Sequence, residues 1–451
     1  MCAFAGEAAS APILAAAPAA TAQPVPKATA KPDPLTVSGY ARAFDFDRLN
    51  EKQNASNPNR TAFNLGGLVK LDYRILDTPF DIGAGYYGDY PFGANGLKPQ
   101  SNAKIDNSLP GYSLSTVGQL YLRYATKGVR AIAGDILYNS AWLPSSDSRM
   151  KPALYQGADI NVSLTPQLSV GASRLTGFEN RNQSEFERQT LLSTTPASGA
   201  VVGSIGYKMP NDFVNASYNG FYDYANLAYV EGGVILDPTS AYKPTISVQY
   251  ANEQQAGKAL SGKVDNDTYG IRIAAAMTKN VVASFGFDDA PWRYTEVAAS
   301  SLSAAEKGIF LPGGGTPAGI SLGGGLYRVA YGGIASPYSD SYATDPLYTT
   351  SISQGVVDRR SAGSSFKGTL TYTSNNKRVL GLLSEAYYDY GNSIGTNNTN
   401  ETDVDVSYRF MPVPATGPYK GLSFRERFAD RDQDTLPYEF RYVRSQLEYD
   451  F

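Results

Sequence analysis

Histidine is absent from the sequence, and cysteine occurs once, at Cys2. These absences exclude Ser-His-Asp and Cys-His nucleophile systems and disulfide bonds within the chain, and they argue against a zinc site. We therefore expect no enzyme and no cofactor. The charge is nearly balanced, at −3 from 39 basic and 42 acidic residues, so nothing electrostatic suggests nucleic acid as a partner.

Long apolar runs are also lacking. Outside the N-terminal region, no stretch approaches the roughly 18 to 20 continuous apolar residues that a membrane helix needs. A helical membrane protein is therefore excluded, but a membrane β-barrel is not, because its strands alternate between apolar and polar residues. The 33 tyrosines, 19 phenylalanines, 44 glycines and 27 prolines favour many strands and turns over helices.

The N-terminal segment 1–34 is rich in alanine and proline, and its prolines oppose regular helix. The triplet Ala20-Thr21-Ala22 fits the small-x-small pattern that signal peptidase cleaves, but no Lys or Arg precedes Lys27. We expect residues 1–34 to be a signal-peptide remnant or a disordered extension. Residues 35–451 are then expected to form one β-barrel domain.

Apolar and polar residues alternate along many segments of the remaining chain, most clearly from Val404 to Phe410. Marking such segments gives about 18 strands, an even number typical of bacterial outer-membrane barrels. Short turns largely alternate with long connections, which are 47–61, 89–113, 136–154, 176–199 and 288–363. The pattern predicts an all-β, transmembrane antiparallel barrel. The alternative is a soluble β-propeller or a pair of β-sandwiches, although no repeat of propeller length is visible.

Six segments carry a more specific pattern in order along the chain. They are Gly39-Tyr40-Ala41-Arg42-Ala43-Phe44, Ala62-Phe63-Asn64-Leu65-Gly66-Gly67, Gln119-Leu120-Tyr121-Leu122-Arg123-Tyr124, Ser146-Asp147-Ser148-Arg149-Met150-Lys151-Pro152, Glu401 to Phe410, and Lys420-Gly421-Leu422-Ser423-Phe424-Arg425. Together they resemble the OprD-like family of outer-membrane porins. The resemblance spans residues 36–451, and the Ser-Asp-Ser-Arg-x-x-Pro segment is its most specific part.

The resemblance implies an 18-stranded barrel in the outer membrane of a Gram-negative bacterium, acting as a substrate-selective channel. It also implies a monomer that contacts outer-membrane lipid, with connections 136–154 and 288–363 folding inward. The terminal aromatic residue Phe451 resembles the signal that the barrel-insertion machinery recognises. Residues 321–335 could add local structure within the longest connection.

Strand parity predicts that cations line the inner wall of the barrel, most of them on three neighbouring C-terminal strands. Guanidinium groups suit a channel for carboxylates because they stay charged and bind both carboxylate oxygens. Arg42 shares a face with Tyr40 and Phe44, so its direction is left open. The predicted pore-lining residues on strands are Arg42, Lys70, Arg123, Arg409, Arg425, Arg427 and Arg444. The alternative is that some of them only form ion pairs with Asp403, Asp405, Glu448 or Asp450.

Asp147 and Arg149 complete the set of predicted pore-lining residues. They lie in connection 136–154, which in the family would narrow the channel. The alternative is that Asp147 caps a turn and Arg149 fixes the connection to the wall by an ion pair. That structural role would still shape the narrow part of the lumen.

These observations favour passive, partly selective diffusion of small hydrophilic solutes, with carboxylate-bearing ones such as amino acids and organic acids as the expected class. A plugged structural or adhesive barrel is the alternative, with 288–363 as its surface module. Apolar packing within the lumen would favour that alternative. An enzymatic barrel is disfavoured because, without histidine, the usual activation of a hydroxyl group is missing.

Overall fold

The structure is a computed structural model. It describes residues 34–50, 59–92, 108–146, 149–191, 197–260, 264–298, 300, 320–331, 333–334, 336–339, 344–355, 363–389, 398–411, 421–433 and 440–451. Residues 1–33 lie outside this set, so the prediction for the N-terminal segment stays a prediction. Among the described residues, no helix is long and apolar enough to cross a membrane.

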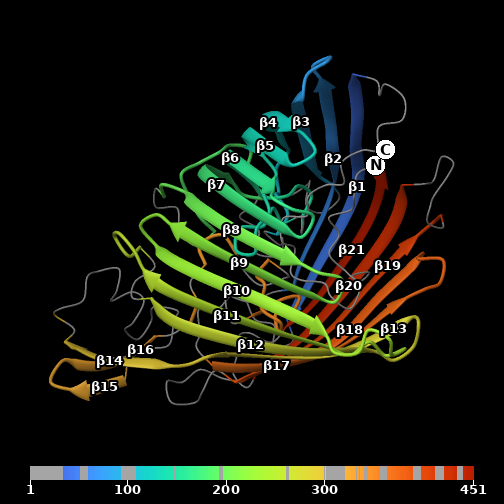
Figure 1. Ribbon diagram of the computed structural model, residues 1–451. Helices are drawn as coiled ribbons and strands as arrows, with labels where there is room; N and C mark the ends of the chain where they lie inside the picture. Colours follow the sequence, from blue (N-terminus) through green and yellow to red (C-terminus); the bar gives the residue numbers. More distant parts are fainter. Residues whose placement is uncertain are drawn as a thin grey trace.

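Eighteen strands form one sheet of antiparallel neighbours, and the sheet closes because the first strand pairs with the last (Figure 1). The predicted 18-stranded barrel is confirmed. The barrel strands are β1 (Leu35–Asn50), β2 (Arg60–Arg74), β3 (Phe80–Pro91), β4 (Leu114–Ala125), β5 (Val129–Ile136), β6 (Leu154–Ser163), β7 (Leu168–Glu179), β8 (Ala200–Lys208), β9 (Asp212–Phe221), β10 (Ala225–Ile235), β11 (Thr245–Gln255), β12 (Asp265–Ala276), β13 (Val281–Ala290), β17 (Gly363–Thr373), β18 (Val379–Asp389), β19 (Thr399–Arg409), β20 (Leu422–Gln433) and β21 (Phe440–Asp450).

The alternation in sequence becomes a division between the outer and inner faces of the wall. On β2, Val69, Leu71 and Tyr73 point outward and are nearly half exposed, whereas Lys70 and Asp72 point inward. Successive side chains of a strand lie on opposite faces, so a period of two is enough to separate the faces. The outer surface is therefore mainly apolar, as a surface in contact with lipid requires.

Strand β1 departs from this simple division. Phe44 and Phe46 are completely buried, because Leu109 and Met150 pack against them inside the barrel. Arg42 lies on the same face as both rings and is 4% exposed. Its direction, which the sequence left open, is therefore inward, and the aromatic residues of this strand line the lumen.

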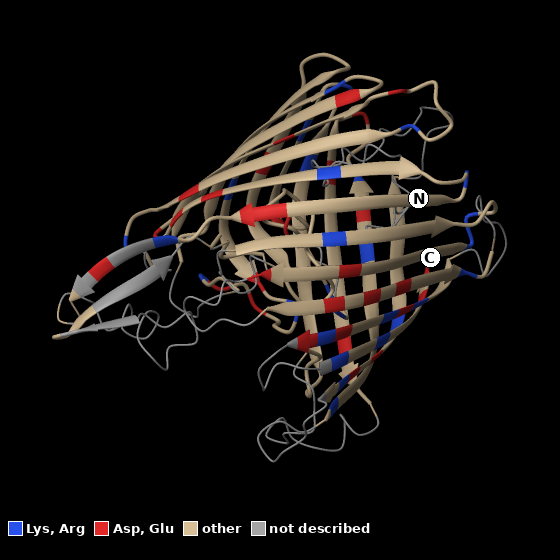
Figure 2. Ribbon diagram, turned by 90° about the horizontal axis from the view of Figure 1, so that it is seen from below, with Lys and Arg blue, Asp and Glu red and all other residues tan. Residues whose placement is uncertain are grey.

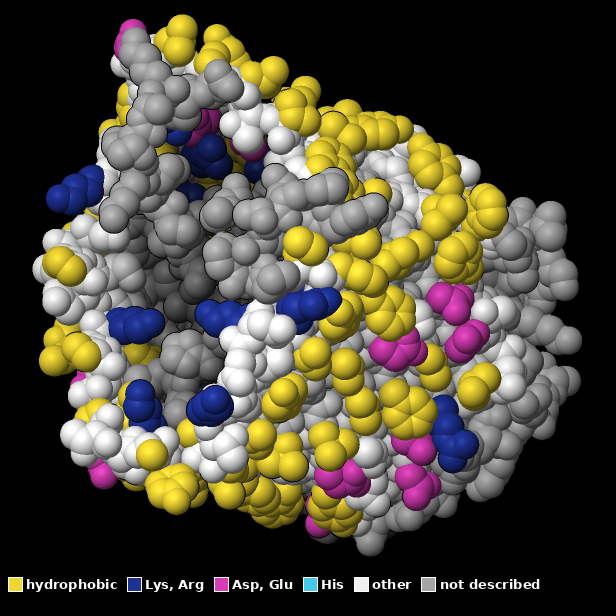
Figure 3. Space-filling view, turned by 90° about the vertical axis from the view of Figure 1, so that its right-hand side faces the viewer, with side chains coloured by type: hydrophobic (Ala, Val, Ile, Leu, Met, Phe, Trp, Pro, Cys, Tyr) yellow, Lys and Arg dark blue, Asp and Glu magenta, His cyan; other side chains and the backbone are white. Residues whose placement is uncertain are grey.

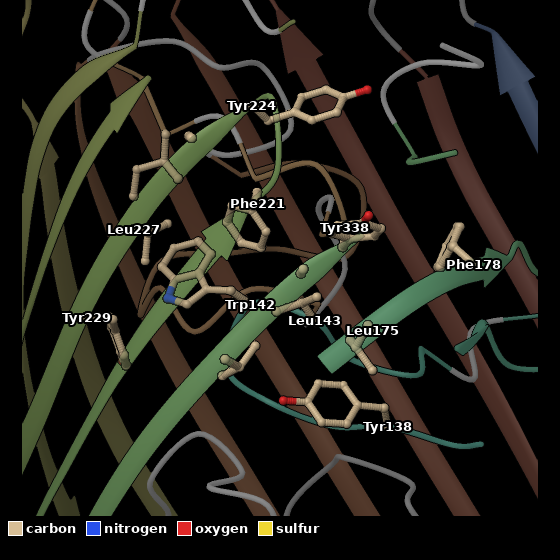
Figure 4. Packing of buried hydrophobic residues seen from close by; sticks show 14 of the residues in the cluster. Tyr138, Trp142, Leu143, Leu175, Phe178, Phe221, Tyr224, Leu227, Tyr229 and Tyr338 are labelled. Atoms are coloured by element: carbon tan, nitrogen blue, oxygen red, sulfur yellow. The ribbon is translucent and has the colours of Figure 1, made fainter. Parts of the chain in front are cut away.

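A large apolar cluster occupies part of the barrel interior (Figure 4). Trp142, from the connection between β5 and β6, is completely buried and meets Tyr229 of β10 with ring centroids 5.7 Å apart. Tyr338, from the connection between β13 and β17, lies 5.6 Å from the Phe178 ring and 5.9 Å from the Phe221 ring. Both connections thus place aromatic side chains against the inner wall.

The connection between β13 and β17 also contains a second, three-stranded sheet. Its strands are β14 (Arg293–Ala298), β15 (Ile320–Gly323) and β16 (Leu326–Tyr331), in the order β14-β16-β15. Figure 1 shows this sheet projecting beyond the barrel wall. Arg293 of β14 pairs with Asp267 on β12, which attaches the base of the sheet to the barrel.

Candidate permeation pathway

Four neighbouring strands, β19, β20, β21 and β1, align inward-facing residues in rows across the wall. In one row, Asp405 lies opposite Arg427, Arg427 opposite Arg444, and Arg444 opposite Phe46. Arg425 faces inward from the next position on β20, two residues away from Arg427. Figure 2 shows basic and acidic positions on adjacent strands of the barrel. Barrel closure therefore brings together residues from the two ends of the sequence.

Arg42 stands at the β1 end of this group and joins the wall to the connection between β5 and β6. Its Nε donates to Glu448 Oε2 at 2.5 Å, and its Nη1 donates to the backbone oxygen of Arg149 at 2.5 Å. The Arg149 guanidinium lies 5.6 Å from the centre of the Phe46 ring, and its Nη2 donates to Ser108 Oγ at 3.4 Å. The predicted loop arginine is thus adjacent to the wall arginines.

Asp405 is the carboxylate around which the β20 arginines gather. Arg425 binds both of its oxygens, at 2.8 and 2.5 Å, and Arg427 Nε lies 3.7 Å from Asp405 Oδ2. Arg444 lies directly across from Arg427 and also interacts electrostatically with Asp405, so three arginines surround this carboxylate. Some of the predicted cations therefore do form ion pairs, as the alternative interpretation of the sequence expected.

Aromatic rings separate the arginines along this wall. The Arg444 guanidinium lies 5.5 Å from the centre of the Phe44 ring and 5.1 Å from that of Tyr442. The Arg42 guanidinium lies 4.4 Å from the centre of the Tyr40 ring. A cation over an aromatic face is attracted by the ring quadrupole, so these rings help to orient the guanidinium groups. These inward-facing rings were not predicted from the sequence, because aromatic residues on barrel strands usually face lipid.

Lys70 and Arg123 belong to a separate network on β2, β3 and β4. Lys70 Nζ lies 3.0 Å from Asp72 Oδ2, and Arg123 donates twice to Asp81 Oδ2 at 3.1 Å. The Tyr121 hydroxyl donates to Asp72 Oδ1 at 2.5 Å. Arg74 Nε also lies 3.4 Å from Asp81 Oδ1, so three cations face two carboxylates in this network.

Of the remaining two predicted residues, only Arg409 is among those that the structure describes. Arg409 shares the inward face of β19 with Asp405 but sits four residues nearer the end of the strand, and it is partly exposed. Asp147 lies outside the described residues, so its prediction is not tested by the structure.

Three further carboxylates hold part of the connection between β13 and β17 against the inner wall. They come from β13 and β19, and each accepts a backbone N–H from the segment 349–353. The bonds are Thr349 N to Asp288 Oδ2 at 2.7 Å, Ile352 N to Asp403 Oδ2 at 3.2 Å and Ser353 N to Glu401 Oε1 at 2.6 Å. Alternation predicts that these acids face inward, but it carries no signal for the distant segment that they bind.

Lys151, two residues after Arg149, forms a completely buried ion pair. This pair was not predicted from the sequence. Its Nζ lies 2.9 Å from Glu179 Oε1, and the two side chains are 1% and 0% exposed. The same nitrogen donates to the backbone oxygen of Asn180 at 2.8 Å. Burial lowers the pKa of Lys151, and the Glu179 carboxylate opposes that shift. This pair fixes the end of the connection between β5 and β6.

Comparison with known proteins gives matches of two kinds. Residues 112–302 match the sequence model of a family described as outer membrane porin, OprD family. No curated protein sequence matches the chain. Among solved structures, *Pseudomonas aeruginosa* OpdK with vanillate is 12% identical at a TM-score of 0.70, with 92% of this chain and 98% of that chain covered.

Two other solved porins are similar to the same extent. A BenF-like porin from Pseudomonas fluorescens Pf-5 is 11% identical with a TM-score of 0.73, covering 93% of this chain and 99% of that chain. OccAB3 from Acinetobacter baumannii is 13% identical with a TM-score of 0.70, covering 92% and 99%. At such low identity these likenesses establish the barrel fold along almost the whole chain.

Proposed function

We propose that this chain, which is an OprD-like outer-membrane porin, passes small carboxylate-bearing solutes across the outer membrane by passive diffusion. The observation that carries the proposal is the group of Arg425, Arg427 and Arg444 around the carboxylate Asp405. A solute carboxylate entering this part of the lumen meets the guanidinium group of Arg425, whose side chain is 18% exposed. Wall contacts there replace the water that the solute loses, which is how a narrow channel lowers the barrier to crossing.

Within this class we favour aromatic acids. A benzoate-like solute would reach the partly exposed guanidinium of Arg425, since Phe44 and Phe46 are covered by Leu109 and Met150. Vanillate, which is present in the solved structure of OpdK, is an aromatic carboxylate of this type. A monomeric state and insertion by the barrel-insertion machinery form part of the same proposal.

Single-channel recording of the refolded protein in a planar bilayer tests this function. The reversal potential under a salt gradient gives the preferred sign of charge, and we expect preference for anions. Blocking by benzoate, by an aliphatic dicarboxylate and by arginine is then compared at equal concentration. The proposal is supported if both acids block the channel and benzoate blocks it more strongly than the dicarboxylate. It is contradicted if the channel prefers cations and only arginine blocks it.

The apolar cluster around Trp142 favours a second candidate, a barrel whose lumen is plugged. Its buried aromatic rings come from two connections and fill part of the interior. A plugged barrel would serve a structural or adhesive role through the projecting sheet β14–β16. The same recording separates the candidates, because a folded but electrically silent barrel would support the plugged one.

A further inference from the structure

The outer surface of the barrel carries an apolar groove near the end of four strands, β13, β17, β18 and β19. Its volume is about 500 Å³, and its lining includes Val281, Leu370, Tyr372, Leu383 and Val406. These side chains lie on the membrane-spanning wall, outside the lumen, so the groove plays no part in the permeation pathway. It opens onto the region that lipid occupies.

Gly381, which lines the groove, helps to explain why the wall is hollowed here, and Gly368 lies nearby on the same outward face. A Cβ atom added at Gly381 would meet only the Cβ of Tyr372, at 3.9 Å, and one added at Gly368 would meet nothing within 4 Å. Neither glycine is required by crowding, since a side chain would fit at both positions. Gly381 thus leaves open a space between neighbouring strands that a valine or leucine would fill.

Two short turns beside the groove carry exposed lysines. Lys279 lies in the turn between β12 and β13, and Lys377 lies in the turn between β17 and β18. Asn280 Nδ2 donates to the Thr373 backbone oxygen at 2.5 Å and to Asn375 Oδ1 at 3.1 Å, so the two turns are neighbours. Figure 3 shows basic side chains around the open end of the barrel, next to an outer wall that is mainly hydrophobic.

The charge beside the groove has one sign. The turns 277–280 and 374–378 are fully described, and neither contains an acidic residue. Arg378 adds a third cation there; its guanidinium lies 4.8 Å from the centre of the Tyr408 ring, and its Nε donates to the Arg409 backbone oxygen at 3.0 Å. Short turns of bacterial outer-membrane barrels face the periplasm, so this cationic site lies at the headgroups of the inner leaflet.

We propose that the groove and its two turns form a binding site for an anionic phospholipid of the periplasmic leaflet, such as phosphatidylglycerol. One acyl chain lies in the groove beside Gly381, and the phosphate lies between Lys279 and Lys377. Lipid tails are as apolar as leucine, so the groove positions the acyl chain but does not distinguish one type of phospholipid from another. Selection comes from the lysines, because basic residues close to a membrane surface attract anionic headgroups.

Native mass spectrometry of the full-length protein tests the site, with phosphatidylglycerol and phosphatidylethanolamine of identical acyl chains added in competition. The test variant is Lys279→Gln combined with Lys377→Asn, since asparagine tolerates the positive φ of 54° at position 377. Each lysine contributes about a fivefold factor, so the double variant should lose about 25-fold in preference for phosphatidylglycerol. Lys127→Gln, which removes an exposed lysine from the turn between β4 and β5, is the matched control and should retain most of the preference.

A second variant tests the groove itself. Gly381→Val fills the space without a steric clash and suits a strand, so the barrel should fold and bind fewer phospholipid molecules. Unchanged preference in the double lysine variant, or an equal loss in Lys127→Gln, would overturn the proposal. Detection of a dimer that Gly381→Val dissociates would also overturn it, because a second copy of the chain would then occupy the groove.

Discussion

Replacing Lys151 with methionine should destabilise the protein strongly while leaving its shape intact. The substitution keeps most of the length of the side chain but removes its charge. The Glu179 carboxylate, which is 0% exposed, then loses the cation that lies 2.9 Å away. Breaking a buried ion pair by removing one partner typically costs about 3–5 kcal/mol, because the remaining charge is buried and uncompensated. The backbone oxygen of Asn180 also loses its donor.

Equilibrium unfolding in urea, with the protein refolded into lipid vesicles, measures this loss. Trp142 lies in the interior cluster, so its fluorescence reports on the connection that Lys151 fixes. The double variant Lys151→Met with Glu179→Leu should recover most of the stability, since an apolar pair often replaces a buried ion pair at little cost. Lys127→Met is the control at an exposed position and should change stability by no more than about 0.5 kcal/mol. A loss under about 1 kcal/mol in Lys151→Met would refute the reasoning.

Three further predictions concern the lumen. Arg149→Ala and Arg425→Ala should each shift the reversal potential toward cations with little loss of stability, and unchanged traces for both would remove them from the pathway. Trp142→Ala should lower the free energy of unfolding in urea by about 3–5 kcal/mol, because it deletes a completely buried ring from the lumen cluster. The same change should raise the conductance. Unaltered conductance would mean that the cluster does not limit passage. Gly83→Ala should cost about 1–3 kcal/mol, since its Cβ would lie 2.2 Å from the Tyr121 ring. Combining it with Tyr121→Ala should give less than the sum of the two losses.

The barrel could be predicted from the sequence because each strand carries its own signal. The alternation from Val404 to Phe410 needs no knowledge of neighbouring strands, and the same holds for the segment around Lys70 and Asp72. Counting such segments gave 18 strands, and parity gave the inward direction of the arginines on β20 and β21. Local periodicity therefore determined the architecture and the face on which each charge lies.

The contents of the lumen could not be predicted in the same way. Phe44 and Phe46 face inward because Leu109 and Met150 pack on them, and those residues come from distant connections. The partner of Lys151 is likewise set by how the connection between β5 and β6 lies against β7. Such contacts have no period along the chain, so residue types alone do not reveal them.

The mode of attachment of the segment 349–353 has a consequence for variation in this protein. Asp288, Asp403 and Glu401 hold this segment through its backbone N–H groups, which every residue except proline provides. Thr349 and Ser353 also donate to Asp288 and Glu401 through their hydroxyl groups, but a change of side chain at these positions leaves the main-chain bonds to the wall in place. The barrel strands can therefore stay the same while the side chains of segment 349–353 vary. The surface that this segment presents to the lumen can be changed without changing the barrel.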